Sequence, residues 1–240
     1  MKIALIGYGK MGHEIENVAV SRGHEIVFIE DALINPQEFD DQHLQKADIA
    51  IEFTRPDAAF GNYMKCFHAG IPVVSGTTGW LEKLPEVKRM CAEEDKTFFY
   101  SSNYSIGVNI FFRLNKFLAE MMNGFNNYDV KMQEIHHIHK LDKPSGTAIT
   151  LAEGVMEKLD RKNAWTLDQN PKQNEILIDS VREGEVPGTH SIKYFSDIDD
   201  IQITHTAYNR TGLAFGAVLA AEFLFGKPSG FYSMDDMMKF

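Results

Sequence analysis

Short apolar runs alternate with amphipathic segments along the first hundred residues of the chain. Runs that are apolar on both faces predict buried parallel strands, and they cover residues 2–6, 25–29, 48–53, 71–74 and 97–100. Helical patterns lie between several of them, as in residues 11–22 and 56–69, each followed by a glycine. This succession of strands and helices predicts a doubly wound α/β domain with a parallel sheet.

The pattern changes after residue 105. A long apolar helix is predicted over residues 106–122, a strand over 129–136 and a helix over 145–159, whose apolar positions recur every 3.6 residues. The polar residues 161–175 predict a loop, and strands follow at 175–182, 189–195 and 200–206. Strands without intervening helices predict a second domain of α+β type with an antiparallel or mixed sheet. By its pattern alone, the last apolar helix, residues 212–225, fits either domain.

A glycine-rich turn joins the first strand to the first helix. Gly7, Gly9 and Gly12 have the GxGxxG spacing that permits a tight turn, close approach of a pyrophosphate and close packing of helix on strand. Glu30 ends the second strand, where a carboxylate can bind an adenosine ribose diol and repel a 2′-phosphate. Its neighbours Asp31, Ala32 and Leu33 supply no cation for such a phosphate. The alternatives are a turn without function and a solvated strand end.

Two polar loops follow later strands of the same sheet. "SGTTGW" at 75–80 and "SSNYS" at 101–105 lie at the carboxyl ends of the fourth and fifth strands, where open α/β sheets bind ligands. Both loops therefore could face a dinucleotide and place its nicotinamide. Ordinary strand-to-helix turns have a similar composition, so the chemistry of these loops alone leaves both interpretations open.

The composition narrows the classes of partner. A formal net charge of -10 disfavours nucleic-acid and anionic membrane surfaces, because both require a basic face. The two cysteines, Cys66 and Cys91, lack a CxxC spacing, which favours a reducing cytoplasm over a disulfide framework. We expect no signal peptide, since glycines and a lysine interrupt the first apolar run, and no apolar run is long enough to span a membrane.

The stretch "EIHHIHK", residues 134–140, gathers histidines and a lysine at the end of a predicted strand. Histidine titrates near neutral pH and a lysine can donate a proton, so His136, His137 and Lys140 are candidates for proton transfer. The histidines, with His139, lack the HExxH spacing and a partner motif, which disfavours a metal site.

The next helix opens with "PSGTA", residues 144–148. Ser145, Gly146 and Thr147 could simply cap that helix. The same groups could instead bind a carboxylate, because a helix N-terminus carries partial positive charge and free N–H groups.

Taken together, these motifs resemble the dihydrodipicolinate reductase family. The resemblance rests on the glycine loop, "FTRP" at 53–56, "SGTTGW", "SNYSIGVN" and above all "EIHHIHKLDKPSGTA", and "VREGEVPGTH" at 181–190 resembles the family's arginine–glycine–histidine hairpin. It covers both predicted domains. It implies reduction of a cyclic dicarboxylate by NADH or NADPH in diaminopimelate and lysine biosynthesis, and a homotetramer joined through the second domain's sheet.

The resemblance also implies roles for individual residues. His136 is the implied proton donor or acceptor and Lys140 a proton donor. The implied substrate contacts are His137, Gly146 and Thr147, and we add Ser145. The implied cofactor contacts are Gly7, Tyr8, Gly9, Lys10, Met11, Gly12, Glu30, Phe53, Thr54, Gly76, Thr77, Thr78, Ser102, Asn103, Tyr104 and Ser105.

We accordingly predict a Rossmann-like dinucleotide-binding domain at residues 1–106 and 210–240, and a substrate-binding and oligomerisation domain at 107–209. NADH is favoured over NADPH because of Glu30, and no metal is predicted. The chain departs from the family in "SSNYS", where "APNFS" is more usual, and in short loops at 30–48 and 161–175. Two other functions stay open: another two-domain amino-acid reductase or dehydrogenase, and a cofactor-sensing module without turnover.

Overall fold

The computed structural model describes residues 1–31 and 41–239. It divides into two compact units, Met1–Ile106 with Thr211–Phe240, and Gly107–Arg210. The chain thus leaves the first unit once and returns to it for its last thirty residues. Of the helices among the described residues, none combines the length and apolar composition needed to cross a bilayer.

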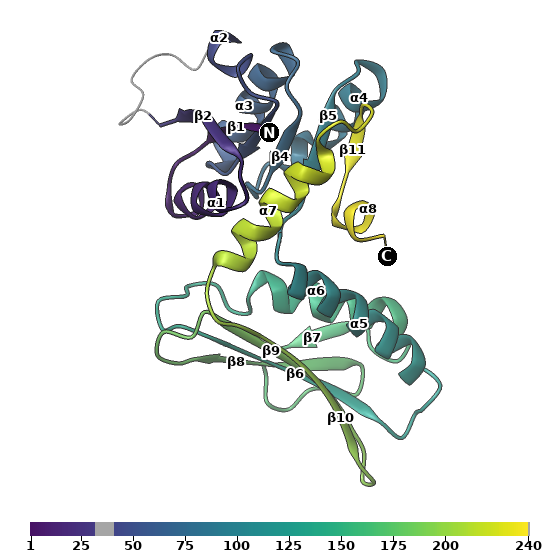
Figure 1. Cartoon of the computed structure of the whole chain (residues 1–240). Helices are drawn as coiled ribbons and strands as arrows, with labels where there is room; N and C mark the ends of the chain where they lie inside the picture. Colours follow the sequence, from purple (N-terminus) through teal and green to yellow (C-terminus); the bar gives the residue numbers. More distant parts are fainter. Residues whose placement is uncertain (32–40, 240) are drawn as a thin grey trace. The chain divides into compact units, whose positions relative to one another are not determined.

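The first unit is built on a six-stranded parallel sheet in the order β11-β5-β4-β3-β1-β2 (Figure 1). Its strands are β1 (Lys2–Ile6), β2 (Glu25–Glu30), β3 (Ile49–Glu52), β4 (Val73–Ser75), β5 (Thr97–Tyr100) and β11 (Gly230–Tyr232). The strand order reverses between β1 and β3. The carboxyl ends of these two strands therefore form the topological switch point at which such sheets bind ligands.

Helices cover both faces of this sheet. They are α1 (Lys10–Ser21), α2 (Asp41–Leu44), α3 (Pro56–His68), η1 (Leu81–Lys83), α4 (Leu84–Glu93), α7 (Thr211–Leu224) and α8 (Met234–Met238). One core cluster joins the sheet to α1, α7 and α8, and a second joins it to α2, α3 and α4. The last long helix, α7, packs against α1, β3, β4 and β5, so the first unit is the one that it completes.

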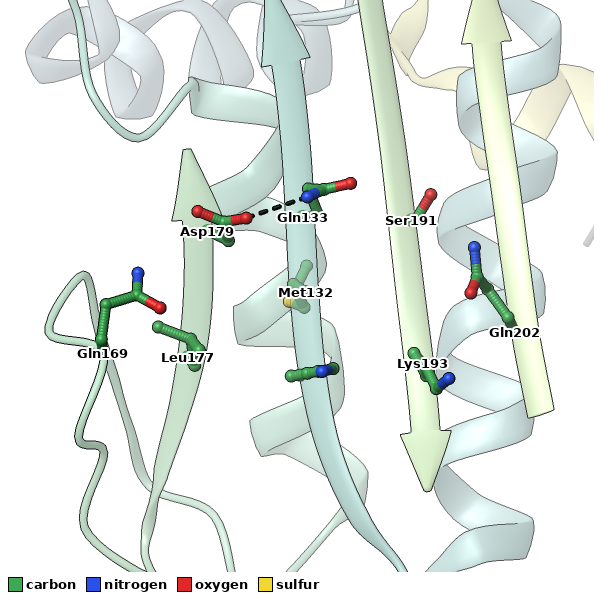
Figure 2. A pocket seen from close by; sticks show the side chains of 9 residues that line it. Met132, Gln133, Gln169, Leu177, Asp179, Ser191, Lys193 and Gln202 are labelled. Atoms are coloured by element: carbon green, nitrogen blue, oxygen red, sulfur yellow. Dashed lines mark hydrogen bonds between the residues drawn. The ribbon is translucent and has the colours of Figure 1, made fainter. Parts of the chain in front are cut away.

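The second unit is a five-stranded mixed sheet in the order β10-β9-β6-β8-β7, with two helices (Figure 1). Its elements are α5 (Ile106–Met122), β6 (Asp129–His136), α6 (Gly146–Lys158), β7 (Ala164–Thr166), β8 (Glu175–Arg182), β9 (Gly188–Phe195) and β10 (Asp200–Ala207). Both helices pack on one face, where Leu118, Leu151 and Ile192 belong to a single core cluster. Figure 2 shows the opposite face, on which Gln133, Asp179 and Lys193 line a shallow pocket.

The predicted fold class, a Rossmann-like parallel sheet followed by a mixed sheet, is confirmed. The prediction of a loop over residues 161–175 was wrong in part, because β7 lies within it and pairs with β8. Trp165 packs against the core of the second unit, and the buried ammonium group of Lys162 donates to the carbonyls of Gln173 and Glu175 at 2.8 and 2.9 Å. These single contacts of Trp165 and Lys162 produce no hydrophobic periodicity, so the strand could not be predicted from the pattern of this polar segment.

Two helical glycines give a matched test of the packing of α7 against the loop of residues 101–105. A Cβ atom at Gly216 in α7 would lie 1.7 Å from the carbonyl oxygen of Tyr104, so Gly216→Ala should lower the free energy of unfolding by about 1–3 kcal/mol or more. Gly61 in α3 has no neighbouring atom within 4 Å of that position, so Gly61→Ala should raise it by about 0.5–1 kcal/mol. Denaturant titration of both variants measures the two changes, and equal effects would contradict the packing of α7 on the 101–105 loop.

Candidate functional site

The glycine loop of the first unit has the geometry of a phosphate-binding turn. Gly7 has φ +89°, and a Cβ there would lie 2.2 Å from the Phe53 carbonyl oxygen, so only glycine fits the turn. At Gly12 a Cβ would lie 2.5 Å from the Gly7 carbonyl oxygen, which explains the close packing of α1 on β1. Around Gly9, by contrast, no described atom lies within 4 Å of a Cβ position, which leaves space for an approaching phosphate.

The start of α1 is also free to receive an anion. Gly9 is its N-cap and, being a glycine, makes no side-chain hydrogen bond to the first turn. The Gly7 N–H donates to the carbonyl of Glu30 at 3.2 Å, which places the predicted ribose-binding residue beside the glycine loop. These features fit a dinucleotide. Residues 32–33, which bear on the discrimination of a 2′-phosphate, and most of the loop 30–48 lie outside the described residues.

The other predicted cofactor residues follow β3, β4 and β5, at the same edge of the sheet. Phe53 packs against Gly76, where a Cβ would lie 2.1 Å from the ring. Tyr8, Lys10, Met11, Thr78, Ser102 and Asn103 are at least partly accessible, whereas Thr77 is buried. Tyr104 is only 2% exposed and donates its hydroxyl to the carbonyl of Ser75 at 2.6 Å, so its side chain supports the loop from within the core.

A buried carboxylate that the sequence analysis missed ties two of these loops together. Glu52, fully buried at the end of β3, accepts hydrogen bonds from the Thr77 hydroxyl at 2.9 Å and from the Thr54 backbone N–H at 3.1 Å. Its second oxygen accepts from the Ser75 hydroxyl at 2.7 Å. Glu52 therefore ties the loop after β3, which borders the topological switch point, to the end of β4 and the loop that follows it.

The second unit gathers its polar side chains on the helix-facing side of the sheet. Glu134 and His136 are two residues apart on β6, so both project to that face. In the strand register His190 of β9 lies opposite Glu134, and Arg182 of β8 lies opposite His136. Three strands thus deliver one acidic and three basic side chains to a single patch beside the start of α6.

Glu134 is the centre of this patch. One carboxylate oxygen accepts from Arg182 Nη2 at 3.0 Å and from the Ser145 N–H at 3.3 Å. The other lies 2.7 Å from Nδ1 of His136, although the ring N–H is not aligned with it. Burial alone would raise the pKa of this fully buried carboxyl group, but the surrounding donors outweigh burial and hold the pKa well below its usual range. An anion therefore lies beside His136 at neutral pH.

The predicted substrate residues have different environments. Ser145 is the N-cap of α6: its buried hydroxyl accepts from the Ala148 N–H at 3.2 Å and lies 3.1 Å from His190 Nε2. Gly146 is exposed, and no described atom lies within 4 Å of a Cβ position there; Thr147 is partly exposed. Nδ1 of His137 is buried and has no hydrogen-bond partner among the described residues.

Lys140 lies in the loop between β6 and α6. Its ammonium group donates to Asp142 at 2.7 Å, and its side chain is 21% exposed. Arg182 Nη2 donates to the Asp142 carbonyl at 2.6 Å, which connects this loop to the Glu134 carboxylate. The loop is thus fastened by the same guanidinium group that holds Glu134.

One cluster has the composition of a metal site. Potential ligand atoms of Glu134, His136 and His190 lie within 4.8 Å of one another. However, the guanidinium group of Arg182 already contacts the carboxylate, and Ser145 lies at hydrogen-bond distance from Nε2 of His190. A second cation would be repelled there, so these contacts favour a hydrogen-bonded network.

The buried imidazole of His190 makes the stability of this patch depend on pH. Burial, reinforced by the neighbouring His136, lowers the pKa of His190 to about 4. In the unfolded chain the imidazole of His190 has a pKa of about 6.5, so as the pH falls it is protonated there before it is protonated in the folded protein. The free energy of unfolding therefore decreases between pH 6.5 and 4. His190→Gln should remove a part of this loss on the order of 3 kcal/mol.

Unfolding free energies measured from pH 7 to pH 4 check this expectation. His139→Gln is the control, because the side chain of His139 is 66% exposed. An equal loss in the wild type and in His190→Gln would contradict the assignment.

Comparison with known proteins places both units in one family. The sequence profile described as "Dihydrodipicolinate reductase, N-terminus" matches residues 1–104, and "Dihydrodipicolinate reductase, C-terminus" matches residues 107–238. The 4-hydroxy-tetrahydrodipicolinate reductase of Christiangramia forsetii is 49% identical over 238 residues, covering 99% of this chain and 98% of the relative. A Staphylococcus aureus protein of the same name is 36% identical, covering 99% of this chain and all of the relative.

Solved structures show the same architecture. A dipicolinate-bound dihydrodipicolinate reductase from Paenisporosarcina sp. TG-14 has a TM-score of 0.78 at 22% identity, covering 98% of both chains. A probable dehydrogenase from Thermotoga maritima has a TM-score of 0.58 at 11% identity, covering 99% of this chain and 93% of its own. The two family profiles and the full-length relatives are decisive: this chain belongs to the dihydrodipicolinate reductase family.

Proposed function

We propose that the chain catalyses the NAD(P)H-dependent reduction of 4-hydroxy-tetrahydrodipicolinate to tetrahydrodipicolinate, with release of water, in diaminopimelate and lysine biosynthesis. One observation carries the proposal: Glu134 contacts both His136 and the N-terminus of α6, so a proton-transfer group and a carboxylate-binding group share one anchor. Full-length relatives at 49% and 36% identity are named for this reaction.

The substrate is a dianion, and the second unit offers complementary groups for it. Gly146 and Thr147 open α6, whose first N–H groups carry partial positive charge. The ammonium group of Lys140 adds a donor nearby in the sequence. Inside a protein of net charge -10, such a local group of donors favours a small dicarboxylate over an apolar or a cationic ligand.

The first unit would hold the dinucleotide through its glycine loop, Glu30 and the loops after β3, β4 and β5, and the nicotinamide supplies a hydride when bound. His136 and Lys140 would supply the proton that the reduced ring must gain. A positioned acid contributes about 10²- to 10⁴-fold to such a step. Neither a transferred proton nor this arrangement of acids is needed for simple binding, which favours an enzyme over a sensing module.

We further propose a homotetramer that functions in the cytoplasm. The support for assembly is the sheet face of the second unit that lies opposite α5 and α6, where Gln133 donates to Asp179 at 2.9 Å (Figure 2). This face suits contact with another copy because it mixes polar groups with Leu177. The support for the compartment is that Cys66 and Cys91 are buried free thiols.

A coupled assay tests the reaction and its proton donors. The preceding synthase supplies the unstable substrate, and NADH consumption is recorded for the wild type, His136→Ala and Lys140→Ala. Both variants should lose at least about tenfold in kcat with nearly unchanged affinity for NADH, because acid catalysis is removed and the cofactor site is not. Wild-type protein that consumes no NADH would refute the function, and a variant that keeps more than about a tenth of kcat would refute that residue's role.

The preference for NADH over NADPH is a separate expectation. A carboxylate at Glu30 should repel a 2′-phosphate, so kcat/KM for NADH should equal or exceed that for NADPH, and Glu30→Gln should raise the relative use of NADPH. Both constants are to be measured in one buffer at one ionic strength. A wild-type preference of tenfold or more for NADPH, about 1.4 kcal/mol, would contradict the assignment of Glu30.

A further inference from the structure

The two oxygens of Glu134 have different partners. Oε1 receives both Arg182 Nη2, at 3.0 Å, and the Ser145 N–H, at 3.3 Å. Oε2 lies 2.7 Å from Nδ1 of His136. The carboxylate is fully buried, so water does not compete for these positions. Arg182 and Ser145 thus fix the orientation of the carboxylate, and the remaining oxygen is directed at one particular nitrogen of His136.

The opposite edge of the His136 ring is kept clear. A Cβ atom at Gly188 would lie 3.0 Å from Nε2 and 3.3 Å from Cδ2, closer than most real contacts of a Cβ atom. Glycine at this position therefore leaves room next to Nε2. Nδ1 is buried against Glu134, whereas Nε2 is the nitrogen for which the backbone of β9 leaves space.

We infer that Glu134, held by Arg182, is a positioning residue that keeps the proton of neutral His136 on Nδ1, so that Nε2 exchanges the proton with the substrate. This inference rests on the proposed function and adds to it the reacting nitrogen and the group that selects it. When Nε2 gains a proton, the carboxylate stabilises the imidazolium ion; when Nε2 gives that proton to the substrate, the ring returns to the Nδ1–H form. The misaligned N–H in this structure needs a rotation of the ring, as catalytic hydrogen bonds often tighten only with ligand bound.

The partners of Oε1 make Glu134→Gln a sharp test. Two donors converge on Oε1, so the amide oxygen of glutamine must take that position, and the NH₂ group must then face Nδ1. An NH₂ group can only donate, so Nδ1 must accept and the proton of neutral His136 must move to Nε2. The variant therefore inverts the tautomer with almost no change in side-chain volume.

Two readouts follow the tautomer and its effect. Nitrogen-15 NMR of histidine-labelled protein should place the proton of neutral His136 on Nδ1 in the wild type and on Nε2 in Glu134→Gln, with the signals assigned by their loss in His136→Asn. In the coupled assay Glu134→Gln should lose at least about tenfold in kcat, with KM for NADH within about twofold. Glu157→Gln is the matched control: it lies on α6 in an exposed pair with Lys116 and should match the wild type in both readouts.

Glu134→Asp is a second variant in case Glu134→Gln does not fold. It keeps the negative charge near Arg182 but shortens the side chain by one methylene, which moves the carboxylate away from His136. It should also lose at least about tenfold in kcat, and neutral His136 should lose its preference for Nδ1–H. Thermal unfolding shows which variants fold, and only the tautomer and kcat of folded variants are used to judge the inference.

An unchanged tautomer in a folded variant overturns the inference, even if kcat falls, because the loss is then structural. A kcat within twofold of the wild type overturns it as well. If the wild type consumes no NADH, the proposed function fails on its own, and the tautomer of His136 still supports or overturns the positioning claim.

Discussion

The candidate substrate site depends on one buried ion pair, between Glu134 and Arg182. Taking both charges out of water is costly, and breaking such a pair by removing one partner typically costs about 3–5 kcal/mol. The pair connects several parts of the site. The carboxylate contacts His136 and the N–H group of Ser145 at the start of α6, and the guanidinium group contacts the loop that contains Lys140. One interaction thereby connects the proposed proton donors to the start of the helix that is proposed to bind the substrate.

The first unit uses a buried carboxylate in a different way. Glu52 has hydroxyl and amide donors around it, from Thr54 in the loop after β3, from Ser75 at the end of β4 and from Thr77 in the loop after β4. Satisfied networks of buried hydrogen bonds rigidify the segments that they join, so the arrangement holds both loops in place. Each unit thus organises its predicted ligand site around one inaccessible acidic side chain.

Local patterns in the sequence were sufficient for the fold, because the strands of the parallel sheet are apolar runs and α5, β6 and β8 have clear periodicity with the predicted bounds. Two strands were missed, β7 and β11, each only three residues long. β11 is defined by pairing with β5, more than 120 residues earlier in the chain, whereas β7 is a short edge strand within a polar segment and pairs with the nearby β8. The helix α4 was also left unassigned, since its polar surface obscures its few buried positions.

The chemistry of the site could be predicted only where a motif is contiguous. His136, Lys140 and the residues that open α6 lie in one stretch that begins with Glu134, whereas Arg182 and His190 reach Glu134 only through the register of three strands. The spacing of two residues between Glu134 and His136 was the available signal, because side chains two apart on a strand share a face. Which oxygen of Glu134 faces which partner depends on side-chain geometry that no sequence pattern encodes.

The most direct test of this account is a crystal structure of the protein with NADH and pyridine-2,6-dicarboxylate, a flat dianion that cannot usefully accept hydride. The account predicts a ligand carboxylate about 3 Å from the N–H groups of Gly146 and Thr147, with Nε2 of His136 towards the ligand and Nδ1 hydrogen-bonded to Glu134. A ligand bound away from the start of α6, or a His136 ring with Nδ1 turned towards the ligand, would contradict it.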